Sequence, residues 1–353
     1  MKTWKFYTNG PQIWQGMLED IRLARTSIEL EQFSFHADRT GKRFLTLLEE
    51  KAKQGVRIRL VCDAVASSQL FASSAPARLR KAGVQILAYN EPDIFHPNLW
   101  LKRTHKKTMV VDSEIAWVGG LGIKDKFKAF RDTQVRATGP LVQDVQKSFE
   151  DIWHYLQQPG RVLNERDFEP DPESGLQLLI NYPNFGKKQI YEWIRNAISK
   201  AEKRIYLSTA YFYPDRNFFQ LLLDKAKSGV DVRIILRGKD DEFVTVRFAT
   251  SFFDSSIVNG IKIYRYLPNI MHAKTAIIDD QATVGSCNLD KFSFYHNLEV
   301  NIASSNPEFV KELEQHFFED LKSCKQIIRE EWQRRPVRER VLEILLWPFH
   351  NYL

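Results

Sequence analysis

The chain contains two copies of one short pattern of side chains that can act on a phosphorus centre. One copy lies in HKKTMVVDSEIAWVGG, which begins at residue 105, and the other in HAKTAIIDDQATVGSCN, which begins at residue 272. Both read H-x-K-x4-D. The repeated residues are His105, Lys107 and Asp112 in the first copy and His272, Lys274 and Asp279 in the second. Equal spacing, with an apolar run and a small-residue turn after each copy, favours one shared site over two unrelated amphipathic strands.

The histidine and the lysine of each copy are two residues apart, so on a strand they point to the same face. If the copies face one cleft, two histidines and two lysines converge. One neutral histidine can then attack phosphorus, while the other, protonated, gives its proton to the leaving oxygen. The lysines supply positive charge where the phosphoryl group gains negative charge. This route forms a covalent phosphohistidine, and we therefore expect neither a metal nor a cofactor.

Two acidic residues are candidates for orienting the histidines. A nucleophilic imidazole needs its tautomer and its ring orientation fixed by a carboxylate. Asp132 and Glu299 each lie 27 residues after a motif histidine (132 − 105 and 299 − 272), at the start of a strand-like run. The motif aspartates, Asp112 and Asp279, belong to the candidate catalytic set by their place in the pattern. They fall at hairpin corners, where we expect them to tie the turn.

Small residues after each hairpin are candidates for binding substrate oxygens. Ser286 and Asn288 follow the second hairpin, whereas the first offers the backbone amide of Gly120. The second hairpin is one residue shorter, which would either be absorbed in its turn or turn Ser286 and Asn288 to the other face. Glu31, at the end of a predicted inner strand, is a further candidate for reaching the cleft.

Sequence similarity between the two halves extends beyond the motif. QIWQGMLEDIRLARTSIEL, from residue 12, matches QIYEWIRNAISKAEKRIYL, from residue 189, and LLEEKAKQGVRIRLVCD matches LLLDKAKSGVDVRIILR. Helix and strand patterns alternate in the same order in both halves. The sequence therefore predicts an α/β protein of two duplicated α/β/α sandwich halves with mixed β-sheets. A pseudo-two-fold would relate the halves, with the active site at their interface.

The predicted domains are residues 1–160, residues 175–325 and a basic, aromatic tail at 326–353. The seam falls in QQPGRVLNERDFEPDPESG, which is rich in proline, glycine and acids. The tail is expected either to dock on the body or to anchor the chain to an anionic membrane surface. The apolar stretch 243–258 is expected either to line an acyl-chain groove or to pack as a core helix.

Composition limits the cellular context and the class of partner. The 353 residues carry a net charge of +7, which favours an anionic partner such as nucleic acid or an acidic membrane. The three cysteines form no pair with metal-binding spacing, and a sparse, odd set suits a reducing compartment. The N-terminus has no signal-peptide core, and no apolar run reaches the roughly 20 residues of a spanning helix.

These residues resemble the phospholipase D superfamily, whose hallmark is a paired H-x-K-x4-D motif, over nearly the whole chain. ELEQFSFHADRTG, FRDTQVRATGPLVQDVQKSFEDIW and MHAKTAIIDDQATVGSCNLD are similar to bacterial cardiolipin synthases of the short, peripheral type. The resemblance implies that phosphatidylglycerol gives its phosphatidyl group to His105, releasing glycerol, with His272 as acid. A second lipid alcohol then takes the group, with His272 as base. Gly122 replaces an asparagine that is usual in the family.

Three other functions remain open from the sequence. A lipid hydrolase of the phospholipase D type would use the same intermediate and differ only in admitting water. A metal-independent phosphodiesterase on nucleic acid fits the charge, but no stacking groove or nucleic-acid module is visible, so nucleic acid is not the expected partner. A non-catalytic scaffold is disfavoured by two intact motifs. The expected setting is the cytoplasmic face of the cell membrane, bound peripherally; the oligomeric state is left open.

Overall fold

The first half of the chain folds around a mixed sheet of seven strands. The computed structural model describes residues 2–91, 102–158, 163, 166–182, 186–238 and 250–335. The strand order is β1-β7-β6-β5-β2-β3-β4. The bounds are β1 Trp4–Asn9, β2 Ser27–Gln32, β3 Arg57–Asp63, β4 Gln85–Tyr89, β5 Lys107–Val111, β6 Ile115–Gly119 and β7 Arg131–Thr138. The helices are α1 Gly10–Leu23, α2 Arg39–Lys53, α3 Ser68–Phe71, α4 Ala75–Lys81, the 3-10 helix Asp125–Ala129 and α5 Leu141–Gln157.

The second half repeats this sheet strand for strand. Its order is β18-β13-β12-β10-β14-β15-β17-β8-β9. The seven strands β8-β17-β15-β14-β10-β12-β13 reproduce the order of the first sheet, and β9 and β18 are added at the edges. The bounds are β8 Leu176–Tyr182, β9 Lys187–Lys188, β10 Arg204–Ser208, β12 Asp231–Arg237, β13 Lys262–Tyr266, β14 Thr275–Ile278, β15 Gln281–Gly285, β17 Glu299–Ser304 and β18 Cys324–Gln326. A separate pair joins β11 Phe212–Tyr213 to β16 Leu289–Asp290. The shared strand order confirms the predicted duplication.

The helices of the second half also follow the order of the first. They are α6 Gln189–Lys200, α7 Arg216–Lys227, α9 Phe253–Val258, α10 Lys291–Tyr295, α11 Pro307–Lys322 and α12 Arg329–Gln333. In both halves a helix ends at a glycine that leads into a buried parallel strand. Gly55 and Gly229 have φ of +92° and +96°, a conformation that glycine adopts without a steric penalty. The equivalent glycines therefore end α2 and α7 at the same point of the repeat.

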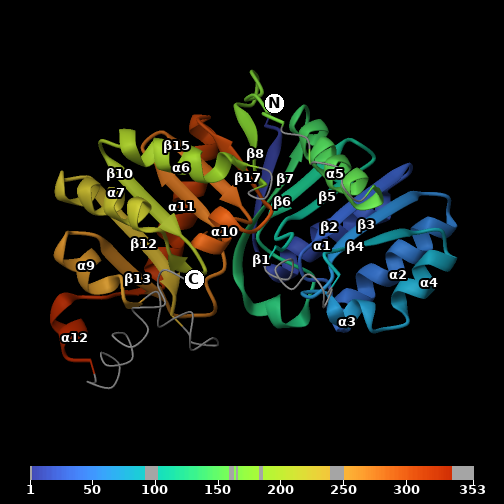
Figure 1. Ribbon diagram of the computed structural model, residues 1–353, viewed down its shortest axis with the longest axis horizontal. Helices are drawn as coiled ribbons and strands as arrows, with labels where there is room; N and C mark the ends of the chain where they lie inside the picture. Colours follow the sequence, from blue (N-terminus) through green and yellow to red (C-terminus); the bar gives the residue numbers. More distant parts are fainter. Residues whose placement is uncertain are drawn as a thin grey trace.

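Apolar packing arranges the two halves in layers (Figure 1). One cluster combines inner-face residues of both sheets, such as Val110 and Ile277, with α5 and α11, so these helices lie between the sheets. A second cluster packs α1, α2 and α4 on the outer face of the first sheet, and a third packs α6, α7 and α9 on the second. Each sheet is therefore covered by helices on both faces, which confirms the α/β/α prediction.

The motif aspartates anchor their hairpin turns. The carboxylate of Asp112 accepts hydrogen bonds from the backbone amides of Arg25, Thr26 and Ser27 at 2.7–3.1 Å. Asp279 accepts from the amides of residues 202–204 at 2.8–3.0 Å. Both aspartates have positive φ, which Asp tolerates better than most residues. Each aspartate thus ties its turn to the start of the neighbouring inner strand, β2 or β10.

The difference in hairpin length is absorbed in the turn. Val111 pairs with Ile115 across three turn residues, whereas Ile278 pairs with Gln281 across two. Gly119 and Gly285 then occupy equivalent places beside the next strand, opposite Gln134 and Asn301. β15, which leads into Ser286 and Asn288, therefore keeps the register of the first half.

Parts of two predicted segments fall within the described residues. In 243–258, residues 250–258 are described, and Phe252 and Phe253 pack in the outer core, as expected of a core helix. Residues 243–249, and 336–353 of the predicted tail, lie outside the described residues. Among the described helices, none has the length and hydropathy of a membrane-crossing segment.

Candidate active site

Backbone bridges between the halves place the motif histidines. Thr104, beside His105, bridges in parallel to Leu298, and the His105 amide donates to the Leu298 carbonyl at 2.9 Å. In the mirror relation, Met271 bridges to Arg131, and the His272 amide donates to the Arg131 carbonyl at 2.7 Å. Each histidine therefore lies next to the residue that precedes the other half's candidate carboxylate.

The carboxylates consequently pair with the histidines crosswise. His105 Nδ1 lies 2.9 and 3.0 Å from the two Glu299 oxygens, and His272 Nδ1 lies 2.5 Å from Asp132 Oδ2. Both carboxylates are fully buried. A carboxylate at Nδ1 selects the tautomer that carries its proton there, which leaves Nε2 with a lone pair. The structure thus brings together all four predicted residues, each carboxylate serving the histidine 140 or 194 residues away in sequence.

The two motif lysines lie beside the histidine main chains. Lys107 Nζ donates to the His105 carbonyl at 2.5 Å, and Lys274 Nζ donates to the His272 carbonyl. Lys274 Nζ also lies 2.8 Å from His272 Nδ1, but the Nδ1 proton belongs to the bond with Asp132, so the carbonyl is the acceptor of Lys274. Both lysines are buried, so two positive groups are held next to the imidazoles without solvent screening.

Aromatic rings pack against both imidazoles and limit their contact with water. Phe33 meets His105 edge to face with centroids 4.6 Å apart, and Phe127 stacks on His272 at 5.7 Å. Burial lowers the pKa of His105, and burial together with the Lys274 charge lowers the pKa of His272 to about 3. Both imidazoles are therefore neutral at pH 7.

The same crowding acts on the lysines and on Asp132. Burial lowers the pKa of Lys107 well below its ordinary value and that of Lys274 to about 8. Burial alone would raise the pKa of Asp132, but the charge of Lys274 and the hydrogen bond from His272 outweigh it and hold the pKa below the usual value. The site is thus an array of basic groups under mutual repulsion, which an anion placed between them would relieve.

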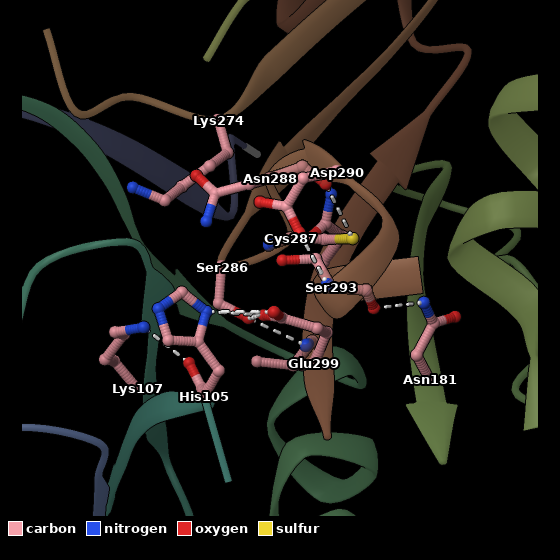
Figure 2. Close-up of polar contacts among 12 residues, drawn as sticks. His105, Lys107, Asn181, Lys274, Ser286, Cys287, Asn288, Asp290, Ser293 and Glu299 are labelled. Atoms are coloured by element: carbon pink, nitrogen blue, oxygen red, sulfur yellow. Dashed lines mark hydrogen bonds and ion pairs between the residues drawn. The ribbon is translucent and has the colours of Figure 1, made fainter. Parts of the chain in front are cut away.

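These groups open into one cleft of about 430 Å³. His105, Lys107, Gly120, His272 and Asn288 are the predicted site residues that line it. Figure 2 shows His105 facing Glu299, with Asn288 beside Lys274. The remaining lining residues are of two kinds. The basic and aromatic ones are Lys124, Lys126, Arg237, Phe33, Phe127, Phe130, Tyr211, Tyr213 and Phe292, and the others are Ser34, Ala66, Asp290, Ser293 and Asn297.

Gly120 and Ser286 occupy equivalent positions with different consequences. A Cβ on Gly120 would lie 2.5 Å from an Asp132 oxygen, so only glycine fits there. Ser286 is fully buried and does not line the cleft; its hydroxyl donates to Glu299 and accepts from the Val300 amide at 3.0 Å. The prediction that Ser286 contacts substrate is corrected to a supporting role, because the carboxylate that orients His105 takes its hydroxyl.

The structure also corrects the placement of Glu31. Its carboxylate lies 2.8 Å from Lys106 Nζ and accepts from Thr104 Oγ1 at 2.6 Å, behind the strand that carries His105. Glu31 is fully buried and is not part of the cleft lining. The reason is the alternation of side chains along an extended segment. Lys106 points away from the face shared by His105 and Lys107, and the Glu31 carboxylate pairs with the Lys106 ammonium on that opposite face.

Several lining residues escaped the sequence reasoning. Aromatic residues read as ordinary core, and nothing in their spacing separated Phe33 or Phe127 from packing residues. Arg237 had a signal: it replaces Asp63 in the aligned stretch LVCD against IILR, and both residues end equivalent strands. A charge reversal at one repeat position indicates that the two halves differ in task. Asp290 lay unnoticed two residues beyond Asn288.

Metal ligands are not grouped in the part of the chain that the structure describes. No cluster of three or more histidine, cysteine, aspartate or glutamate side chains with metal-binding geometry occurs there. The donors of the site are instead paired one carboxylate to one imidazole.

Comparison with known proteins agrees with this geometry. A family model described as "Cardiolipin synthase, PLD-like domain" matches residues 17–153 and 194–321. A cardiolipin synthase of Geobacillus sp. is 33% identical over 351 residues, covering 95% of this chain and 69% of that protein. One from Clostridium perfringens is 30% identical over 357 residues, covering 96% and 75%.

The fold is also found among solved structures. A phosphatidylserine synthase of Haemophilus influenzae has a TM-score of 0.77 at 14% identity, covering 99% of this chain and 93% of that one. At this identity the likeness shows the fold alone. The family model and the two relatives carry the assignment, and the chain belongs to the cardiolipin synthase family of PLD-like proteins as an enzyme of the phosphatidyltransferase class.

Proposed function

We propose that the enzyme moves a phosphatidyl group from phosphatidylglycerol to the hydroxyl of a second lipid alcohol, with release of glycerol. The observation that carries this proposal is the pair of neutral imidazoles in one cleft, each held at Nδ1 by a buried carboxylate of the other half. Such an arrangement offers one Nε2 for attack and one for proton transfer.

In the first half-reaction, His105 Nε2 attacks the phosphorus of phosphatidylglycerol. The bond from phosphorus to the glycerol oxygen breaks, and a protonated His272 gives its Nε2 proton to that oxygen, so glycerol leaves neutral. Glu299 stabilises the charge that develops on His105, as Asp132 does for His272. The product is a phosphatidyl group bound to His105 through a P–N bond.

The second half-reaction runs through the same groups in reverse roles. His272, now neutral, takes the proton of the incoming hydroxyl, whose oxygen attacks phosphorus while the P–N bond breaks. With a second phosphatidylglycerol as acceptor, the product is cardiolipin. Transfer rather than hydrolysis requires that the alcohol reach the intermediate before water does.

The anionic substrate supplies the proton state that His272 needs. A phosphodiester between Lys107 and Lys274 adds negative charge where burial and repulsion lower the pKa values of both lysines and of His272. An opposite charge within a few ångströms raises the pKa of a basic group. Substrate binding therefore favours protonated lysines and a protonated His272 at the moment of attack.

The cleft mouth supports a peripheral position on an anionic membrane. Lys124, Lys126 and Phe127 lie on the segment around the 3-10 helix Asp125–Ala129 and line the cleft, with Lys128 exposed beside them. Basic and aromatic side chains suit the headgroup region of an acidic leaflet. We place the enzyme on the cytoplasmic face, where three free cysteines remain reduced.

The test separates the two histidines. A phosphatidyl donor with a p-nitrophenol leaving group needs no acid in the first step, since p-nitrophenolate departs without a proton. His272→Asn should then release one equivalent of p-nitrophenol and retain a phosphatidyl adduct on His105, detected by intact mass. His105→Asn should show neither. A burst in His105→Asn instead of His272→Asn would reverse the roles, and adducts in neither would sink the covalent route.

Product analysis tests the substrate assignment. Wild-type protein is incubated with phosphatidylglycerol vesicles, and lipids and glycerol are measured together. Cardiolipin and glycerol in equal amounts support transfer. Phosphatidic acid alone would mean that water takes the group, and the enzyme would be a lipid hydrolase.

A further inference from the structure

The second half contributes a polar wall to the cleft that the reaction described above does not use. Asp290, Ser293 and Asn297 line it together with Asn288, and Asp290 pairs with Tyr213 of β11, another lining residue. Figure 2 draws the Asp290 carboxylate and the Asn288 amide between Lys274 and the pair formed by His105 and Glu299. The acid is specific to this half, because the equivalent position of the first half, five residues beyond Gly119, is Lys124.

Two hydrogen-bond acceptors of this wall border the cleft. Asn288 is 4% exposed, and its Oδ1 has no hydrogen-bond partner among the described residues. Asp290 is 2% exposed and caps α10: its Oδ1 accepts from the Ser293 amide at 2.8 Å, and the Phe292 amide and the Ser293 hydroxyl also donate to its carboxylate. Buried acceptors without partners cost stability, and a group that donates hydrogen bonds removes that cost.

The chemistry of the wall selects the donor. Phosphate oxygens only accept, so they cannot satisfy Asn288 Oδ1 or the Asp290 carboxylate. An ammonium group would meet repulsion from Lys107 and Arg237, which line the same cleft. Neutral hydroxyl groups satisfy the acceptors without that repulsion. Burial raises the pKa of Asp290 to about 7, so its carboxyl group can accept from one hydroxyl and, when protonated, donate to another.

We propose that Asp290, with Asn288, forms the subsite that binds the vicinal hydroxyl groups of a glycerol headgroup and so selects polyol acceptors over simple alcohols. The proposal rests on the phosphatidyl transfer proposed above and names the acceptor for that site. Asp290 acts as a positioning residue: it holds the alcohol, while His272 takes the proton.

Competition between two acceptors isolates this step. The donor carries p-nitrophenol, so its release reports formation of the intermediate without a glycerol leaving group. Glycerol and 1-propanol, equal in concentration and in carbon number, then compete for the same phosphatidyl-enzyme. The ratio of phosphatidylglycerol to phosphatidylpropanol depends on the acceptor subsite alone. Ethanolamine in a third arm tests recognition of an ammonium.

Asp290→Asn is the informative variant, because Asn is as good an N-cap as Asp and keeps the bond to Ser293 at the start of α10. It should lower the glycerol-to-propanol ratio roughly tenfold, the effect of losing one hydrogen bond to a buried acceptor, with p-nitrophenol release little changed. Asp290→Ser, another good cap with a shorter side chain, should lower the ratio similarly. The matched control is Asp215→Asn, the same change at the N-cap of α7 outside the cleft, which should leave the ratio as in wild type.

Each outcome has one meaning. If both Asp290 variants keep the wild-type ratio of phosphatidylglycerol to phosphatidylpropanol but release p-nitrophenol more slowly, the proposal is overturned. Asp290 would then only support the structure around the catalytic residues. If the wild-type enzyme transfers the phosphatidyl group to ethanolamine in preference to glycerol, the proposal is overturned too. If wild type forms only phosphatidic acid with every alcohol, the transfer function itself fails, which the ratio experiment distinguishes from loss of acceptor selectivity.

Discussion

The ammonium group of Lys106 lies 2.8 Å from the carboxylate of Glu31, and neither side chain has any exposed surface. Thr104 donates a hydrogen bond to Glu31, and Lys106 donates to Ser148 on α5 and to Tyr182 on β8 of the second half. Buried ions are tolerated only when paired and fully hydrogen-bonded. The network therefore fixes residues 104–106, and with them His105, against both α5 and the sheet of the second half.

Removing one partner of this pair should be costly. Lys106→Met leaves the Glu31 carboxylate buried without its counter-ion, and we expect it to lower the free energy of unfolding by about 3–5 kcal/mol. The double variant Lys106→Met, Glu31→Gln should recover much of that loss, because no uncompensated charge remains. Urea unfolding of the three proteins measures this. Equal destabilisation in the single and double variants would show that packing, not charge, sets the cost.

Loss of either crossed carboxylate should slow turnover without unfolding the protein. Asp132→Asn and Glu299→Gln keep the shape of the side chain but no longer fix the Nδ1 tautomer or stabilise the imidazolium. We expect kcat to fall about 10²- to 10⁴-fold in each. Steady-state kinetics beside thermal melting checks this, with Asp20→Asn as a buried-carboxylate control outside the cleft. A kcat within twofold of wild type in either variant would remove that carboxylate from the mechanism.

The aspartate of the motif should behave differently from its histidine and lysine. Asp112 accepts hydrogen bonds at the turn between β5 and β6 and does not line the cleft. Asp112→Asn should cost about 1–3 kcal/mol of stability from weakened hydrogen bonds, while kcat per folded molecule stays near wild type. A large fall in kcat at unchanged stability would contradict the assignment of Asp112 to the turn.

Acid should destabilise the fold through His272. Its pKa of about 3 in the folded protein lies below the 6.5 of a free histidine, because burial, Phe127, Phe130 and Lys274 oppose the charged form and Asp132 only partly offsets them. Between these values the unfolded chain binds more protons, so stability falls as the pH drops from 6.5 towards 3. The loss reaches up to about 5 kcal/mol, and His272→Gln should flatten this part of the curve. Parallel curves for both proteins would contradict the shift.

The lysines around the 3-10 helix Asp125–Ala129 should determine how tightly the protein binds acidic vesicles. Lys124→Ala and Lys126→Ala should each weaken binding to vesicles of phosphatidylglycerol about fivefold, from roughly 1 kcal/mol per basic residue near the surface. Cosedimentation at low and high salt measures the effect, which should shrink as salt rises. Lys81→Ala, an exposed lysine at the end of α4, is the control. A loss of binding as large for Lys81→Ala would place the contact elsewhere.

Periodicity and repetition in the sequence determine most of the fold. The matched pairs of helix and strand, with Gly55 against Gly229, predict two equal halves because the same backbone signals occur in the same order. The duplicated sheet order follows from them. What periodicity cannot supply is the extension of the second sheet by β9 and β18, whose two and three residues are too short to show an alternating pattern.

The site was predictable as far as local pattern reaches. His105, Lys107, Asp132 and their counterparts recur at fixed spacing, so the repeat marks them. The crossing of the pairs is a property of the interface, and no spacing within one half reveals it. The position of Glu31 at the end of an inner strand and of Ser286 in the small-residue turn after the hairpin predicts that both reach the cleft. Their side chains instead satisfy buried partners, Lys106 and Glu299, which only the packed structure identifies.

The crossed histidine and carboxylate pairs also bear on how such a chain could arise. Neither half holds a complete pair, so a single half would be inactive alone, whereas two identical copies around a two-fold axis would form both pairs at once. The present chain has the geometry of a homodimer whose subunits are joined end to end. Joining frees the copies to diverge. When the two halves are aligned, Lys106 corresponds to Ala273 and Asp63 corresponds to Arg237. Identical subunits could not differ at these positions. In a symmetric homodimer the two histidines are equivalent, so either could attack the phosphorus. In the fused chain their surroundings differ, so one histidine can be specialised for attack and the other for proton transfer.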